Sequence, residues 1–249
     1  MGTPATGIPE TLVETLRGAY SDAVLTGSGI SAESGVPTFR DAQTGLWARY
    51  DPMELATPEA FTRDPRLVWE WYAWRRKLVE GASPNPGHEA LAELERHVPE
   101  FTLITQNVDG LHRRAGSQRV IELHGNIMRS ICSREGVVAE PRGDDPEVPP
   151  TCLRCGAILR PDVVWFGETL PQKELEEAFM AAHNCDLFFS IGTSSLVQPA
   201  ASLPFEALRG GVSVVEVNSD ETPLTRHVEY GLRGRAGEVL PALVRAAYG

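Results

Sequence analysis

The stretch AVLTGSGISAESGVPTFRD, residues 23–41, decides the fold class of this chain. It opens with a short apolar run typical of a buried parallel strand, and Gly27, Gly29 and Ala32 follow in the spacing G-x-G-x-x-A. Small residues at these positions let the backbone approach a pyrophosphate, and the N-terminus of the next helix favours negative charge. The stretch therefore predicts the first strand, turn and helix of a Rossmann-like fold that binds a dinucleotide.

One feature of a standard dehydrogenase is missing after this turn. No acidic residue ends a second strand about 20 residues further on, where it would bind the adenosine ribose. The chain instead continues through Phe39 and Arg40, and the guanidinium of Arg40 suits a phosphate. The alternative for this pair is a packed aromatic residue beside a surface cation. An ordinary dehydrogenase is therefore disfavoured.

Strand-like and helix-like segments alternate along the rest of the chain, which predicts an α/β fold with a parallel sheet flanked by helices. We expect strands at residues 23–26, 101–105, 186–192 and 212–218. We expect helices at residues 9–18, 88–97, 171–183 and 238–247.

Two segments fit this alternation poorly, and we interpret them as insertions that form a smaller lobe within one domain of residues 1–249. Residues 34–84 hold proline, tryptophan and helical patterns without a strong strand, and residues 126–179 hold three of the four cysteines. We predict a helical part in the first segment and a zinc-ribbon-like module in the second. The Rossmann-like large lobe then comprises residues 1–33, 85–125 and 180–249.

Charge and cysteine usage limit the partners and the compartment. The 249 residues include 23 Lys and Arg against 34 Asp and Glu, a formal net charge of −11, which argues against nucleic acid and anionic membranes as partners. No run of 18 apolar residues and no signal-like N-terminus occurs, so we expect no membrane segment. The four cysteines are then thiols or metal ligands in a reducing cytoplasm. No obligate protein partner is evident.

Five motifs that follow one another along the chain give a more specific indication. They are GSGISAESGVPTFRD (27–41), TQNVDGLH (105–112), ELHGN (122–126), RPDVVWFGE (160–168) and GTSSLVQPA (192–200). In this order they resemble the sirtuins, the NAD-dependent protein-lysine deacylases, and the resemblance covers nearly the whole chain. One departure is Ser28, which stands where the family usually has alanine.

The resemblance implies that NAD is cleaved and consumed while an acyl group leaves a lysine of a protein or peptide, releasing nicotinamide and O-acyl-ADP-ribose. It assigns His124 as the catalytic base, and imidazole suits this role because its ordinary pKa lies near working pH. It places Asn107 in the catalytic centre as well. Two alternatives remain open, a sirtuin-like protein ADP-ribosyltransferase and a catalytically silent NAD-binding module.

The same resemblance implies a set of NAD contacts in the loops that follow the predicted strands. These residues are Gly27, Ser28, Gly29, Ile30, Ala32, Phe39, Arg40, Gln106, Asn107, Val108, Asp109, Gly192, Thr193, Ser194, Asn218 and Ala236.

The acyl group is indicated by Tyr72 and Arg75, whose Y-x-x-R spacing puts them on one face of a helix. The pair resembles the signature of the bacterial class III sirtuins, which favour acidic acyl groups such as succinyl and malonyl, and Ala56 matches a small residue that leaves room for them. A guanidinium and a phenol can both hydrogen-bond a carboxylate. The alternative is an amphipathic helix with Tyr72 packed and Arg75 solvated.

The segment VVWFGE, residues 163–168, matches a strand that pairs with the substrate peptide in this family, opposite residues 195–198. Val164 and Phe166 could equally belong to the core. The expected substrate contacts are Ala56, Tyr72, Arg75, Val164, Phe166, Gly167 and Val197.

The metal module departs from the family pattern, which is two C-x-x-C pairs holding structural Zn²⁺. Cys152 and Cys155 form one pair. The other pair is incomplete, because Glu135 stands three positions after Cys132, where the pattern has a fourth cysteine. We predict structural zinc on these three cysteines, with Glu135 or another group as fourth ligand. The alternative is a metal-free loop held by packing. Cys185 precedes a strand and is expected to be a buried core thiol.

Overall fold

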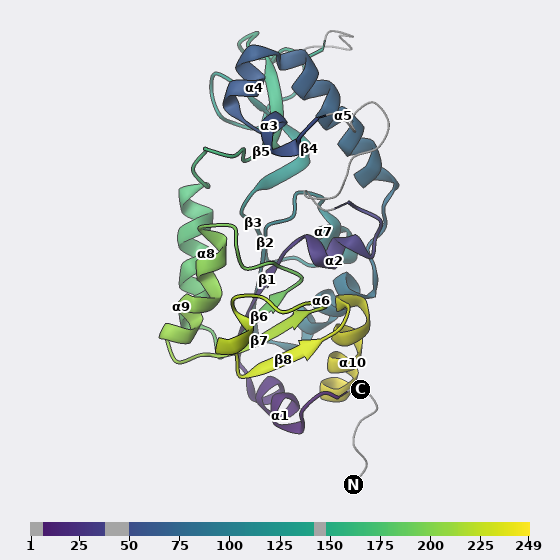
Figure 1. Ribbon diagram of the computed structural model, residues 1–249, viewed down its shortest axis with the longest axis vertical. Coiled ribbons are helices and arrows are strands. Elements are labelled where there is room, and N and C mark those ends of the chain that lie inside the picture. Colours follow the sequence, from purple (N-terminus) through teal and green to yellow (C-terminus); the bar gives the residue numbers. More distant parts are fainter. Residues whose placement is uncertain (1–6, 38–49, 142–147) are drawn as a thin grey trace.

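The structure, a computed structural model, describes residues 7–37, 50–141 and 148–249. Its main element is a six-stranded parallel sheet in the order β3-β2-β1-β6-β7-β8 (Figure 1). The strands are β1 (Ser21–Thr26), β2 (Glu100–Thr105), β3 (Val120–Glu122), β6 (Leu187–Ile191), β7 (Ser213–Asn218) and β8 (Tyr230–Arg233). The Rossmann-like parallel sheet predicted from the sequence is confirmed.

Helices cover both faces of this sheet, so its central strands are buried on both sides and are almost continuously apolar (Figure 1). One face packs against α1 (Glu10–Gly18), α6 (Pro86–His97) and α10 (Ala236–Tyr248). The other packs against α8 (Gln172–Asn184) and α9 (Leu203–Arg209), which begins after a 3₁₀ turn at Ala200–Ser202.

The four predicted strands and four predicted helices are present, with ends displaced by one or two residues. The short strands β3 and β8 and the helix α9 were not predicted. Both missed strands lie at the edges of the sheet and have only three and four residues, too few to show a pattern.

The order of the strands places a crevice beside β1. The chain moves outward from β1 through β2 to β3, then returns to the other side of β1 and moves outward again through β6, β7 and β8. The connections therefore diverge between β1 and β6. In open parallel sheets, ligands bind outside the carboxyl ends of the strands at such a point.

A second, antiparallel sheet of β4 (Gly125–Cys132) and β5 (Leu159–Val163) lies at one end of the molecule beside three helices (Figure 1). Each of these helices has a side-chain cap followed by proline at its first position, which explains why a proline-rich segment is helical. They are α3 (Pro52–Leu55), α4 (Pro58–Arg63) and α5 (Pro65–Gly81).

One expected strand needs correction, and two predicted NAD contacts cannot be placed. Of the segment 163–168 expected as a strand, only Val163 belongs to β5, and Glu168 folds back because its backbone N–H donates to the carbonyl of Trp165. Phe39 and Arg40 fall outside the described residues.

Candidate active site

Three glycines join the loop after β1 to the loop after β6. The backbone N–H of Gly27 donates to the carbonyl of Ile191 at 3.0 Å, and that of Gly29 donates to the carbonyl of Gly192 at 2.8 Å. A Cβ added to Gly192 would lie 2.6 Å from the nitrogen of Ile30, and Gly192 also has a φ of +58°. The glycines of the motif thus let two loops meet backbone to backbone at the carboxyl ends of β1 and β6.

Asn107 holds this turn from the neighbouring strand β2. Its side-chain Nδ2 donates to the carbonyl of Gly27 and to the hydroxyl of Ser31, both at 3.0 Å. The backbone of Asn107 is itself fixed, because its N–H donates to the hydroxyl of Thr105. Both amide hydrogens of Asn107 are therefore used within the protein. Ser31 was not among the predicted residues, and it lies on α2 (Ser28–Ala32).

The imidazole ring of His124 is held by a hydrogen bond at one of its two nitrogens. Its Nδ1 lies 2.9 Å from the carbonyl oxygen of Gln106, which can only accept, so Nδ1 carries the proton and Nε2 keeps its lone pair. Burial lowers the pKa of His124, while the hydrogen bond to Gln106 acts in the opposite direction. The result is a neutral imidazole whose Nε2 is unprotonated and can accept a proton.

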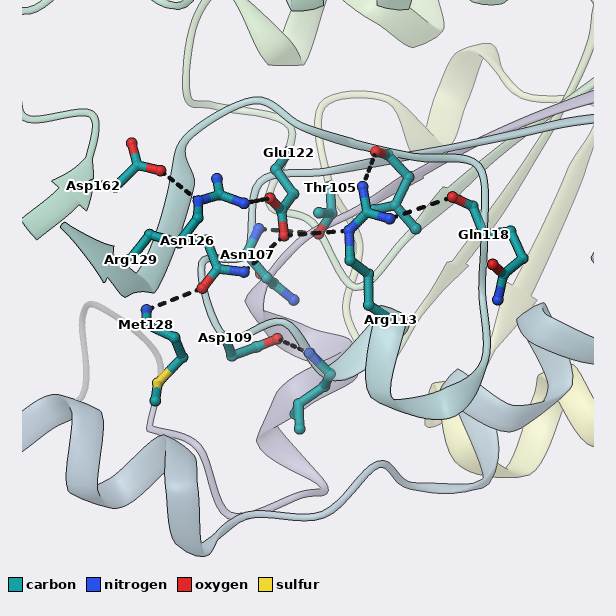
Figure 2. Close-up of polar contacts among 12 residues, drawn as sticks. Thr105, Asn107, Asp109, Arg113, Gln118, Glu122, Asn126, Met128, Arg129 and Asp162 are labelled. Atoms are coloured by element: carbon teal, nitrogen blue, oxygen red, sulfur yellow. Dashed lines mark hydrogen bonds and ion pairs between the residues drawn. The ribbon is translucent and has the colours of Figure 1, made fainter. Parts of the chain in front are cut away.

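The polar residues after β2, β6 and β7 are linked to one another. Gln106 Nε2 donates to the hydroxyl of Thr193 at 3.1 Å, and Asn218 Nδ2 donates to the carbonyl of Thr193 at 2.8 Å. Asp109 is buried and accepts from the backbone N–H of Leu111 at 2.9 Å (Figure 2). Burial raises the pKa of Asp109.

The other predicted NAD contacts differ in how deeply they are buried. Ile30 is fully buried, Ser28 and Ala32 are exposed, and Ser194 is half-buried. Ala236 is buried at the first position of α10, where it packs in the core beneath the sheet. Val108 packs with the aromatic residues around α5.

Three successive residues connect His124 to the predicted acyl site. The backbone N–H of Val164 donates to the carbonyl of His124 at 3.0 Å. The indole N–H of Trp165 donates to the hydroxyl of Tyr72 at 3.0 Å, and the backbone N–H of Phe166 donates to the carbonyl of Ala56 at 2.9 Å. Residues far apart in the sequence are therefore brought to one short segment.

Tyr72 and Arg75 lie one turn apart on α5. Tyr72 is buried, and the Cζ atom of Arg75 lies 5.2 Å from the ring centre of Trp71. Burial raises the pKa of the Tyr72 phenol, and the charge of Arg75 opposes this. Burial also lowers the pKa of Arg75, opposed by Tyr72. A carboxylate here would stabilise a guanidinium that has lost much of its hydration.

The exposed predicted substrate residues flank this segment. Phe166 and Val197 are each 39% exposed, and Gly167 has a φ of +88°, which lets the chain turn back. These residues are apolar, and their exposure makes them available to a ligand.

An ion-pair network anchors the loop that carries His124 (Figure 2). Glu122 accepts from Asn126 at 2.8 Å and from Arg129 at 2.7 Å, and Arg129 also contacts Asp162 at 2.7 Å. Because Glu122 belongs to β3 and Asp162 to β5, the network bridges the two sheets on either side of His124. Sequence reasoning missed Arg129 and Asp162.

Three cysteines form the candidate metal centre. The sulfur atoms of Cys132, Cys152 and Cys155 all lie within 4.8 Å of one another, close to the separation of about 3.8 Å expected for thiolates on tetrahedral zinc. The residues therefore fit a zinc ion that takes one further ligand. Glu135 does not join them and instead forms an ion pair with Arg154.

Cys185 is the fourth cysteine and lies apart from this cluster. It is buried, and burial raises the pKa of its thiol to about 12. The prediction of a core thiol is confirmed.

The parallel sheet, the loops joined by glycines beside His124, and the separate β4–β5 sheet define a sirtuin-type domain. The model of the Sir2 family matches residues 27–199, and the chain belongs to this family.

Relatives and solved structures agree with this membership. The chain is 54% identical over 243 residues to an NAD-dependent protein deacylase of Methylococcus capsulatus, covering 94% of this chain and 95% of the relative. A Sir2 homolog–NAD complex is 48% identical, with a TM-score of 0.90 and coverage of 99% and 96%. A Sir2 protein bound to an acetylated peptide is 31% identical, with a TM-score of 0.85 and coverage of 95% and 97%.

Proposed function

We propose that this chain is an NAD-dependent protein-lysine deacylase that removes succinyl, malonyl and acetyl groups and favours the acidic ones. The observation that carries the proposal is the contact of Val164, Trp165 and Phe166 with His124, Tyr72 and Ala56, respectively. It brings a neutral imidazole and the tyrosine of the Y-x-x-R pair to one segment. The names of the deacylase relative and of the NAD and peptide complexes support the same reaction.

The loops at the carboxyl ends of β1, β2, β6 and β7 would hold NAD, because they offer small residues and polar side chains at the point where the strand order reverses. When bound, NAD supplies the ADP-ribosyl group that accepts the acyl group, with nicotinamide as the leaving group. The proposed contacts are Gly27, Ser28, Gly29, Ile30, Ala32, Gln106, Asn107, Val108, Asp109, Gly192, Thr193, Ser194, Asn218 and Ala236.

His124 is the proposed base. Its Nε2 can take a proton from a hydroxyl, and the resulting positive ring is stabilised by the Gln106 carbonyl at Nδ1. Asn107 contributes by holding the Gly27 turn against Ser31, directly after the residue that orients His124.

Arg75 and Tyr72 are the proposed partners of the acyl carboxylate, and the small side chain of Ala56 leaves space for the longer acyl chain. The exposed Phe166 and Val197, with Val164 and Gly167, would line the acyl-lysine and its peptide. A peptide bound through its backbone suits an enzyme that accepts many protein substrates.

We also propose zinc on Cys132, Cys152 and Cys155, where it would link the loops of the second sheet. Its proposed role is structural, because three thiolates with one further protein ligand would leave no open position on the ion for a substrate. Elemental analysis of the purified protein is expected to give about one equivalent of zinc. Less than about a tenth of an equivalent would contradict the proposal.

The state of the cysteines bears on the compartment in which the protein works. All four cysteines are free thiols, which supports a reducing cytoplasm as the working compartment. Within the described residues, no helix has the length and apolar character to cross a membrane.

We place the small lobe at residues 34–84 and 126–179, and limited proteolysis with mass spectrometry would test these boundaries.

One assay tests the central proposal. The protein is incubated with NAD and either a succinyl-lysine or an acetyl-lysine peptide, and the products are followed by mass. We expect nicotinamide, O-acyl-ADP-ribose and a peptide that has lost its acyl group, with a higher kcat/KM for the succinyl peptide. ADP-ribose attached covalently to protein, or no turnover, would instead favour a transferase or a silent binding module.

A further inference from the structure

Trp165 makes a hydrogen bond that restricts the chemistry of Tyr72. Its indole N–H donates to the Tyr72 hydroxyl at 3.0 Å, and the two residues are only 3% and 2% exposed. An indole nitrogen is a donor only, so the phenol oxygen must accept this bond. The phenol hydrogen is then directed away from Trp165, and Tyr72 can offer it to an acceptor.

The indole ring is itself held in place by an ion pair. The Cζ atom of Arg160 lies 3.4 Å from the ring centre of Trp165. The two terminal nitrogens of Arg160 donate to the two oxygens of Glu168 at 2.6 and 2.8 Å, a bidentate pair. Glu168 also accepts from the backbone N–H of Trp165 at 2.8 Å.

The charge of Glu168 is maintained by these contacts. Burial acts to raise its pKa, but the hydrogen bonds from Arg160 and from the Trp165 backbone outweigh burial, and the pKa of Glu168 is lowered. At neutral pH the carboxylate therefore binds both the guanidinium that lies against the indole ring and the backbone N–H of Trp165. Trp165 has little freedom to turn its N–H away from Tyr72.

We propose that Trp165, clamped by Arg160 and Glu168, is a positioning residue for acyl selectivity that fixes the Tyr72 hydroxyl as a donor to the carboxylate of the acyl group. This inference rests on the proposed preference for acidic acyl groups. An acetyl group has no carboxylate, so its recognition does not depend on this hydrogen. Trp165 therefore affects the choice between acyl groups without touching the carboxylate.

The test replaces Trp165 by Phe, which keeps an aromatic ring under Arg160 and removes the N–H. We expect KM for a succinyl-lysine peptide to rise about fivefold, the loss of one neutral hydrogen bond, with kcat changed less than about twofold. Kinetics with an acetyl-lysine peptide are expected to stay within about twofold. Trp69→Phe is the matched control, because Trp69 is a buried tryptophan of α5 that packs against the cysteines.

A double-mutant cycle with Tyr72→Phe separates positioning from simple structural damage. In the Tyr72→Phe background, Trp165→Phe is expected to cause no further rise of the succinyl KM. Independent, multiplicative effects of the two substitutions, or equal KM increases for both peptides, would overturn the inference. If the unmodified protein shows no preference for succinyl over acetyl peptide, the proposed function fails instead, and the two failures are distinguishable.

Discussion

The two sides of the site are built in opposite ways. On the side of the parallel sheet, two loops meet through glycine backbones, as at Gly29 and Gly192. On the side of α5, Tyr72 and Trp165 are large buried aromatics, and Arg160 lies against the indole ring. His124 connects them, because it bonds to Gln106 on one side and Val164 on the other.

The two sides differ in how far a substitution can change the choice of acyl substrate. A contact between two backbones tolerates no added side chain, so the glycine loops allow little variation. A pocket of packed side chains can be altered one hydrogen bond at a time. We therefore expect substitutions on the glycine side to affect both acyl substrates equally, and substitutions around α5 to affect one substrate.

The largest effect is expected where the two sides meet. His124→Tyr removes the base and should reduce kcat/KM about 10³-fold for succinyl and acetyl peptides alike. NAD affinity, measured by calorimetry, is expected to be retained. Turnover of either peptide within tenfold of normal would show that another residue is the base.

Gly192→Ala tests the glycine side. The new Cβ would lie 2.6 Å from the Ile30 nitrogen at a positive φ, and we expect a loss of about 3 kcal/mol in unfolding free energy from strain and overpacking. Weaker NAD binding should accompany the loss. Gly211→Ala is the control, since Gly211 has a φ of +78° but open space around its Cβ, and should lose only about 1 kcal/mol. Equal losses in urea denaturation would refute the packing explanation.

Arg75→Met tests the α5 side. We expect desuccinylation to fall about 10- to 150-fold, the value of a hydrogen bond to a charged group, while deacetylation changes little. Lys77→Met is the control, because Lys77 is an exposed cation on the same helix. A similar fall in both activities would remove the distinction between the two sides.

The smallest effect is a shared pH dependence. Because burial lowers the pKa of His124 below its ordinary 6.5, more than half of the imidazole is still neutral at pH 6.5. The kcat/KM for both peptides should therefore remain above half of its plateau at pH 6.5 and fall only at lower pH. Separate inflections for the two peptides would indicate that they use different bases.

The sequence predicted the sheet side of the molecule better than the α5 side. Strand β1 and its glycine turn carry a local signal, since an apolar run and small residues at fixed spacing are needed wherever this turn occurs. The edge strand β3 is too short for such a signal. Trp165 lies within a quoted motif, but its bond to Tyr72 spans 93 positions and has no local spacing. The ion pair of Glu135 with Arg154, which takes this carboxylate away from the cysteine cluster, likewise has no local signal in the sequence.

By itself, the sequence determined the fold class, the likeness to the sirtuins and the residues that form the loops beside β1, because these depend on apolar periodicity and on glycine, which act over a few residues. Only the tertiary structure decided that Nε2 of His124 is the free nitrogen and that the Tyr72 hydroxyl must accept from Trp165. The direction of a hydrogen bond depends on the partner that folding brings within 3 Å, and chain order does not specify that partner.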